Sequence, residues 1–192
     1  MKHSVLKKII LIGASTGGPG QIQKIINSIP KLNNTTVIIA QHMVDGFIES
    51  FANQLKDSSH NSVSVIKDEQ LLQNSHIYLC EGQTQIKKEG SALQFSHKRV
   101  AENSFNPDIN QLFNSFIPLT KDIKILSVIL TGIGDDGVSA CKELSLNGAR
   151  CVTESQKSAI VDGMPSRARL LVPNIEVEDI NTIVKTISEF CE

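Results

Sequence analysis

The sequence predicts an α/β domain with a doubly wound, mostly parallel sheet, helices on both faces and an antiparallel hairpin region in the middle of the chain. Apolar strand-like runs alternate with segments of helical periodicity at both ends of the chain. Two glycine-rich turns each follow an apolar run and precede a helical segment. Strands that are joined through helices pair in parallel with right-handed crossovers, which gives a sheet with helices on both faces.

The amino-terminal part begins with a βαβ unit. An apolar run that begins at Ile9 predicts the first strand, and apolar residues at helical spacing predict a helix that Pro30 ends. Residues 36–40 predict the second strand, which a second helix follows. The apolar positions that mark the two helices are Ile22, Ile25, Ile26 and Ile29, then Phe47, Phe51 and Leu55.

The middle of the chain breaks this alternation. Three short β-rich runs, around 63–66, 76–80 and 84–95, predict hairpins. A buried strand over 123–130 then leads into the second glycine turn, and Val152 begins another strand. The apolar positions that mark the remaining helices are Ile109, Leu112, Phe113 and Phe116; Val138, Cys141 and Leu144; and Ile180, Ile183, Val184 and Ile187. No linker or repeat separates these parts, so we expect one domain over residues 1–192.

Composition excludes several classes of partner. The chain has 192 residues and a net charge of −1, without the basic excess of a nucleic-acid binder or a membrane-surface protein. No apolar stretch reaches the roughly 20 residues that span a bilayer, and no signal peptide is recognised, so we expect a cytoplasmic protein without membrane insertion. The four cysteines lack the spacing of a metal site, and we expect buried, reduced thiols, no metal and no cofactor.

The first glycine turn has the pattern of a nucleophile elbow. Residues 13–17 fit G-x-S-x-G, in which Gly13 and Gly17 allow a sharp turn between strand and helix and Ser15 stands at the apex. The helix that follows directs free N–H groups at the same place, where they can bind an anion. This pattern predicts a serine nucleophile.

A histidine follows the next strand directly. His42 comes after residues 36–40, and the carboxyl ends of neighbouring parallel strands lie at one edge of a sheet, so we expect it close to Ser15. The competing interpretation is a histidine that is simply buried in the core. The other histidines, which have no comparable position, are His3, His60, His76 and His97.

The second glycine turn, residues 131–137, supports two mechanisms. In one, an aspartate of the turn orients His42, so that Ser15, His42 and Asp136 form a nucleophile, base and orienting acid. In the other, the turn is a G-x-G-x-x-G dinucleotide fingerprint and Glu154 binds a ribose. Two carboxylates beside a pyrophosphate would repel it, which disfavours the nucleotide. Glycine turns also leave strands in α/β proteins without any catalytic role.

Four ordered stretches resemble one family, the catalytic domain of the chemotaxis protein-glutamate methylesterases (CheB type). They are residues 12–18, residues 40–52 with their Gln-His-Met segment, residues 130–137, and Gly163-Met164-Pro165. The resemblance implies that Ser15 is the nucleophile, His42 the general base and Asp136 its partner. It also implies an oxyanion hole formed by backbone N–H groups of Thr16 and Ile133.

The implied reaction is hydrolysis of γ-glutamyl methyl esters on the cytoplasmic region of chemoreceptors, which releases methanol during chemotaxis adaptation. Deamidation of receptor glutamines by the same route is a second implied activity. Two alternatives stay open: a non-catalytic receptor-binding module and, with less support, a nucleotide-binding α/β enzyme. A serine-directed covalent probe separates the esterase from both.

The sequence departs from the family pattern at several places. Relatives usually carry an N-terminal receiver domain, but only eight residues precede Ile9, so we expect no receiver domain and activity that is constitutive or controlled by a separate regulatory protein. The other departures, which spare Ser15, His42 and Asp136 but bear on receptor choice, are Val44, Asp45, Gln54, Asp108, Asn110 and the stretches 80–82 and 153–156.

Overall fold

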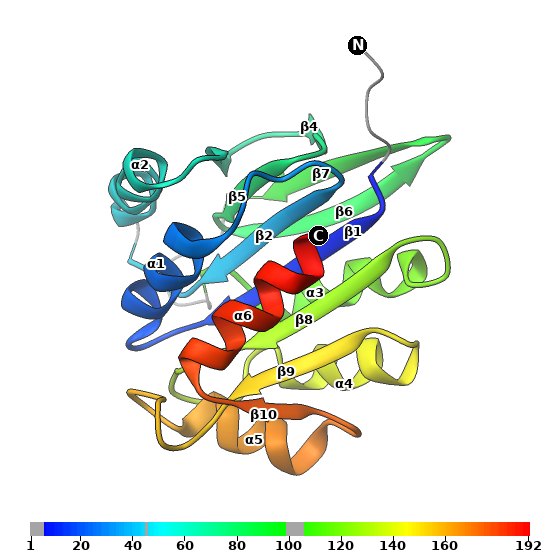
Figure 1. The fold of residues 1–192 in the computed structure, drawn as a ribbon. Coiled ribbons are helices and arrows are strands. Elements are labelled where there is room, and N and C mark those ends of the chain that lie inside the picture. The colour runs from blue at the N-terminus through cyan, green and yellow to red at the C-terminus, as the bar shows by residue number, and fades with distance from the viewer. Residues whose placement is uncertain (1–5, 45, 99–105) are drawn as a thin grey trace.

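The computed structural model describes residues 6–44, 46–98 and 106–192, and its central feature is a seven-stranded sheet in the order β10-β9-β8-β1-β2-β5-β3 (Figure 1). Every neighbouring pair in this sheet is parallel. The strands are β1 (Lys8–Ala14), β2 (Thr35–Gln41), β3 (Ser62–Ile66), β5 (His76–Cys80), β8 (Lys124–Ile129), β9 (Arg150–Glu154) and β10 (Glu176–Glu178). The chain winds outward from β1 in both directions, so the carboxyl end of β1 is the topological switch point where such sheets place their sites.

Helices cover both faces of the sheet, as the sequence predicts (Figure 1). One hydrophobic cluster joins the sheet to α1, α2 and α6, and a second joins it to α3, α4 and α5. The helices are α1 (Gly18–Ser28), α2 (Phe47–Ser58), α3 (Ile109–Phe116), α4 (Val138–Leu146), α5 (Gly163–Leu171) and α6 (Ile180–Cys191), with a short 3-10 helix η1 (Ile117–Leu119) after α3. Strand β1 is apolar from Ile9 to Ile12 because both of its faces are covered.

A small antiparallel sheet in the order β4-β7-β6 packs beside α3. It contains β4 (Gln70–Leu71), β6 (Gln83–Glu89) and β7 (Ala92–Lys98). The predicted hairpin over 84–95 is confirmed, since β6 and β7 pair antiparallel. The prediction for the two earlier runs is wrong, because β3 and β5 pair in parallel within the main sheet. Their connection carries β4, which pairs with β7 instead of closing a tight turn.

Helix α2 corrects one predicted core position. Its residues Phe51 and Leu55 are buried as expected, but Phe47 is 64% exposed and Ile48 is buried in its place. Phe47 is the first residue of the helix after Gly46, and a spacing of four residues drifts away from the core face over two turns. Phe47 therefore lies on the surface near the carboxyl end of β2.

Replacement of Phe113 by alanine should lower the free energy of unfolding by about 3–5 kcal/mol, because the ring is fully buried between α3 and the sheet and would leave a cavity. Denaturant unfolding of the purified domain measures this change. The matched control is Phe47→Ala, which removes an exposed ring and should change stability by less than about 0.5 kcal/mol. Equal losses in the two variants would contradict the assigned core.

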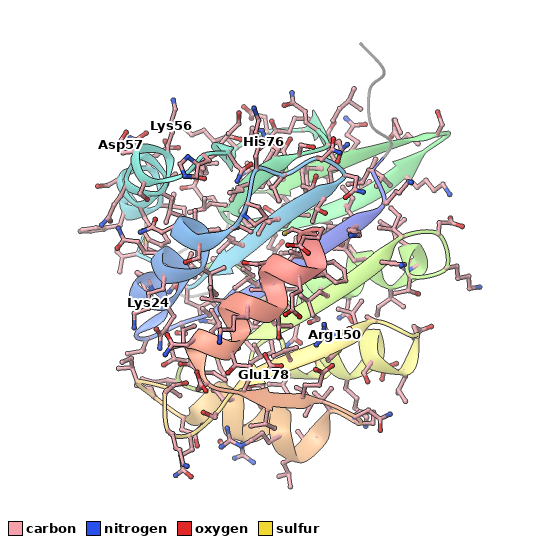
Figure 2. The ribbon with its side chains drawn as sticks, viewed as in Figure 1. Lys24, Lys56, Asp57, His76, Arg150 and Glu178 are labelled. Carbon is pink, nitrogen blue, oxygen red and sulfur yellow. The ribbon has the colours of Figure 1, made fainter. Side chains whose placement is uncertain are left out.

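The surface is polar and mixed in charge. Side chains of both signs project outward around the molecule, among them Lys24, Lys56, Asp57 and Arg150 (Figure 2). No helix within the described parts of the chain is long and apolar enough to cross a membrane. The four cysteines, Cys80, Cys141, Cys151 and Cys191, are buried free thiols, as expected.

Candidate active site

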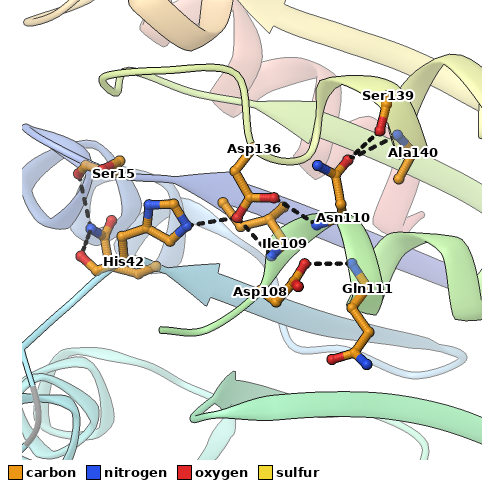
Figure 3. A network of polar contacts seen from close by, with 10 residues as sticks. Ser15, His42, Asp108, Ile109, Asn110, Gln111, Asp136, Ser139 and Ala140 are labelled. Carbon is orange, nitrogen blue, oxygen red and sulfur yellow. Dashed lines mark hydrogen bonds and ion pairs between the residues drawn. The ribbon is translucent and has the colours of Figure 1, made fainter. Parts of the chain in front are cut away.

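Ser15 and His42 follow neighbouring strands at the same edge of the sheet (Figure 3). Strands β1 and β2 pair up to Ala14 and Gln41, so Ser15 and His42 are the first residues after the paired part of each strand. The His42 N–H donates to the Ala14 carbonyl at 2.9 Å, and the Ser15 N–H donates to the Thr131 carbonyl at 3.0 Å. The structure therefore brings together the predicted nucleophile, the predicted base and the second glycine turn.

The two glycines of the elbow have different roles. Gly17 has a φ of 84°, which favours glycine, and it caps α1. Gly13 was expected to provide the turn, but it lies within β1, and a Cβ there would be 2.8 Å from the Cγ2 atom of Ile109. Gly13 is therefore required for close packing of α3 on the sheet, and the turn itself depends on Gly17.

His42 and Asp136 form a short contact. The His42 Nε2 atom lies 2.7 Å from Asp136 Oδ2, and the two side chains are 13% and 6% exposed. The Asp136 carboxylate also accepts the Ile109 N–H at 2.9 Å and the Asn110 N–H at 3.0 Å. Burial by itself raises the pKa of Asp136, but these three hydrogen bonds outweigh it and lower that pKa below its usual range. The carboxylate is therefore ionised and fixed in place.

The stability of the fold should depend on pH through Asp136. Because its pKa is lower in the folded protein, the carboxylate stabilises the fold above the unfolded-state pKa of about 3.9, and this contribution is lost as the pH falls through the folded-state pKa. We expect the difference in free energy of unfolding between the wild type and Asp136→Asn to be largest above about pH 5 and to shrink in acid. Denaturant titrations over this range measure it, and a constant difference would contradict the expectation.

Contacts in the first turns of α3 and α4 hold in place the α3 residues that bind Asp136. Asp108 caps α3 by accepting the Gln111 N–H at 2.7 Å. The Asn110 side chain accepts the Ser139 hydroxyl at 2.8 Å and the Ala140 N–H at 3.0 Å, which ties α3 to α4 (Figure 3). The sequence placed Asp108 and Asn110 only in a loop near the site. An aspartate three residues before a helical N–H is a capping signal that identifies Asp108, but the role of Asn110 requires the tertiary contact.

Glu154 overturns the nucleotide interpretation of the second turn. It is fully buried, and its carboxylate accepts the Gln21 amide at 2.7 Å, the Ser158 hydroxyl at 3.0 Å and the Thr131 N–H at 3.0 Å. Burial raises its pKa despite these contacts. A carboxylate enclosed in this way cannot reach a ribose. Its contacts hold residue Thr131, at the start of the second turn, against α1.

The second turn lies directly against Ser15. A Cβ on Gly132 would be 2.7 Å from the Ser15 Cβ atom, so only glycine permits this approach. Thr131 donates its hydroxyl to the Thr16 carbonyl at 2.9 Å, which links the elbow to the turn. The N–H groups of Thr16 and Ile133 donate no hydrogen bond to another group of the described residues. The Ile133 side chain is exposed.

Among the described histidines, His42 is the one that contacts Asp136. His76 begins β5 and contacts the Ser64 hydroxyl at 2.8 Å, and burial lowers its pKa (Figure 2). His60 follows α2, and His97 lies in the small sheet. His3 and Asp45 lie outside the described residues. No cluster of three or more His, Cys, Asp or Glu side chains that could hold a metal ion is found in 6–44, 46–98 and 106–192.

A parallel α/β sheet that presents a serine, a histidine and a buried aspartate at its switch point has the architecture of the serine hydrolases, with the residues in the order serine, histidine, aspartate. Residues 10–187 match the family model described as CheB methylesterase. The chain belongs to the CheB methylesterase family.

Relatives of known name agree with this assignment. The chain is 35% identical over 183 residues to the protein-glutamate methylesterase/protein-glutamine glutaminase of Bacillus subtilis, covering 91% of this chain and 50% of that protein. It is 34% identical over 168 residues to protein-glutamate methylesterase/protein-glutamine glutaminase 2 of Carboxydothermus hydrogenoformans, covering 84% of this chain and 47% of that protein. The chain thus spans about half the length of these curated relatives.

A solved structure has the same fold. The crystal structure of the Thermotoga maritima CheB methylesterase catalytic domain superposes with a TM-score of 0.86 at 26% identity and covers 96% of this chain and 99% of that one. The predicted fold class, a mostly parallel sheet with helices and a small antiparallel sheet, is confirmed.

Proposed function

We propose that this chain is a protein-glutamate methylesterase that hydrolyses γ-glutamyl methyl esters on chemoreceptors, with Ser15 as nucleophile, His42 as general base and Asp136 as its orienting partner. The observation that carries the proposal is the 2.7 Å contact between His42 Nε2 and an aspartate carboxylate that two backbone N–H groups also bind. This arrangement favours the tautomer with the proton on Nε2, which leaves Nδ1 to accept the Ser15 proton. The imidazole lies between Ser15 and Asp136 (Figure 3).

The reaction follows from these roles. His42 Nδ1 takes the hydroxyl proton as Ser15 Oγ attacks the ester carbonyl. The resulting oxyanion accepts hydrogen bonds from the backbone N–H groups of Thr16 and Ile133. The tetrahedral intermediate collapses, the methoxy group leaves as methanol with the proton from His42, and an acyl-enzyme forms. Water activated by His42 then hydrolyses the acyl-enzyme and releases the glutamate carboxylate. Asp136 stabilises the imidazolium in both halves of the reaction.

The same machinery supports a second activity, the deamidation of receptor glutamines. Attack on a γ-carboxamide gives a similar tetrahedral intermediate, from which ammonia leaves instead of methanol. The names of both relatives include protein-glutamine glutaminase, which favours this activity. The substrates would be the cytoplasmic regions of chemoreceptors, and the enzyme would act in the cytoplasm.

Two measurements test the proposed function. Methanol release is followed from a methylated chemoreceptor cytoplasmic fragment, and a fluorophosphonate probe is applied to the same preparation with the labelled peptide identified by mass spectrometry. The expected result is methanol release together with a label on Ser15. Receptor binding without release or label would instead support the non-catalytic module, and release with a label on another serine would overturn the assignment of Ser15.

A further inference from the structure

The last residue of β2, Gln41, connects the backbones of the predicted nucleophile and base. Its side chain is 1% exposed, and its Nε2 group donates to the Ser15 carbonyl at 2.9 Å and to the His42 carbonyl at 2.7 Å. Two carbonyl acceptors require the NH₂ end of the amide at this position, which fixes the orientation of the group. One amide therefore bridges the two residues between which a proton must move.

This bridge continues the sheet beyond the point at which its backbone ladder ends. The parallel pairing of β1 and β2 ends at Ala14 and Gln41, just before Ser15 and His42. The Gln41 NH₂ group joins the two segments just beyond these strands by binding the carbonyls of Ser15 and His42. The Ser15 carbonyl also accepts the Gly18 N–H at 2.9 Å, so the elbow is held from both the helix side and the strand side.

The other end of the amide lies in an unfavourable environment. Gln41 Oε1 is buried and has no hydrogen-bond partner in the part of the chain that the structure describes. An unsatisfied buried acceptor destabilises the fold, and such groups in native proteins call for a functional explanation. The bonds of the NH₂ end to Ser15 and His42 provide one.

The same contact explains a glycine that the nucleophile elbow does not require. A Cβ on Gly18 would lie 2.0 Å from Gln41 Oε1 and 2.7 Å from the Cβ atom of Ala14, so any side chain there would displace the amide. The second glycine of the Gly17-Gly18 pair and the glutamine before His42 are therefore two halves of one packing arrangement.

We propose that Gln41 is a positioning residue that holds Ser15 and His42 at the separation needed for proton transfer. The proposal rests on the proposed function, because it assigns Gln41 a task in the same reaction without contact to the substrate. A displacement of about 1 Å between reacting groups can reduce a rate about 100-fold. The loss of a bridge that spans nucleophile and base should therefore affect catalysis more than substrate binding.

The test is Gln41→Met, which keeps a long side chain and removes both donated hydrogen bonds. We expect kcat per folded molecule to fall by about 10- to 100-fold with KM changed less than about twofold, and the rate of fluorophosphonate labelling to fall by the same factor. Gln41→Glu retains the shape of the side chain and should give the same loss, so it serves if the methionine variant does not fold.

A matched control exists at the opposite end of the sheet. Asn61, just before β3, is also a buried amide that joins two backbone groups, since it accepts the Leu32 N–H at 2.8 Å and donates to the Pro30 carbonyl at 3.1 Å. Asn61→Leu should lower thermal stability but should leave kcat and the labelling rate within about twofold of the wild type. Equal losses of kcat in both variants would mean that Gln41 contributes to the stability of the fold and not to the positioning of Ser15 and His42.

A second readout separates this proposal from the proposed function. The NMR signals of the His42 ring nitrogens report the environment of the imidazole whether or not the protein hydrolyses esters. We expect Gln41→Met to shift and broaden these signals, while Asn61→Leu leaves them unchanged. A wild type that neither hydrolyses the ester nor reacts with the probe would refute the function, but shifted signals would still support the positioning. Unchanged His42 signals, or a wild-type rate in a folded Gln41→Met protein, would overturn it.

Discussion

Replacement of Ser15 by alanine is expected to reduce methanol release from a methylated chemoreceptor fragment by about 10⁴- to 10⁶-fold. Alanine removes the only atom that forms a bond to the substrate in the proposed mechanism, while the elbow, the second glycine turn and the His42 contact with Asp136 are unchanged. Receptor affinity should therefore stay within about twofold of the wild type, because the lost interaction belongs to the transition state.

The matched control for this variant is Ser28→Ala at the other end of α1. The Ser28 hydroxyl is exposed and donates to the Lys24 carbonyl, so its loss should leave methanol release unchanged. Release is measured at equal concentrations of wild type and both variants, and binding is measured by titration of the same fragment. Retained hydrolysis in Ser15→Ala would mean that another residue attacks the ester.

The fold follows from local patterns wherever strands are long and buried. The apolar run of β1 and the helical spacing of Ile22, Ile25 and Ile26 gave the first βαβ unit because both faces of that strand are covered. The directions of β3 and β5 did not follow, since a short strand has the same pattern in parallel and antiparallel pairs. Their direction is seen only in the main sheet, where β3 pairs in parallel with β5 and β5 pairs in parallel with β2.

The part of the candidate site that depends on strand ends could be predicted from the sequence. Ser15 and His42 each come directly after a strand, and the geometry of parallel sheets brings such residues together. The buried residues that hold the site in place could not be predicted, because a glutamine or glutamate near a strand end has the same local sequence pattern whether it is exposed or buried. The role of Gln41 depends on its contact with Ser15 on the neighbouring strand, and that of Glu154 on its contact with Thr131.

Gly13 shows a second limit of local patterns. The G-x-S-x-G spacing indicates two glycines without distinguishing a backbone requirement from a packing requirement. The positive φ of Gly17 is a property of the turn, whereas the need for glycine at position 13 arises from Ile109, about a hundred residues later in the chain. The structure therefore supports the turn role expected of Gly17 and corrects that of Gly13, while Ser15 as nucleophile stays a prediction.

Replacement of Asp136 by asparagine is expected to lower kcat by about 10³- to 10⁴-fold with little change in KM. The carboxylate accepts three hydrogen bonds, from His42, Ile109 and Asn110, and an amide of the same shape has only one acceptor atom. If the amide oxygen accepts the Asn110 N–H, the NH₂ group faces His42 and favours the tautomer with the proton on Nδ1. That tautomer cannot take the proton of Ser15.

In that orientation the NH₂ group also faces the buried Ile109 N–H, and in the opposite orientation it faces the Asn110 N–H, so one backbone donor is left unpaired either way. Such a group costs about 1–3 kcal/mol, so Asp136→Asn should lose stability as well as activity. The adjacent Asp135→Asn is the matched control, since Asp135 is exposed in the same turn and its loss should change kcat by less than about threefold. Steady-state methanol release per folded molecule, together with the NMR signals of the His42 ring nitrogens, measures both effects. Equal activity in the two variants would remove Asp136 from the proposed mechanism, and a lower rate per folded molecule without a change in the His42 tautomer would contradict the tautomer explanation.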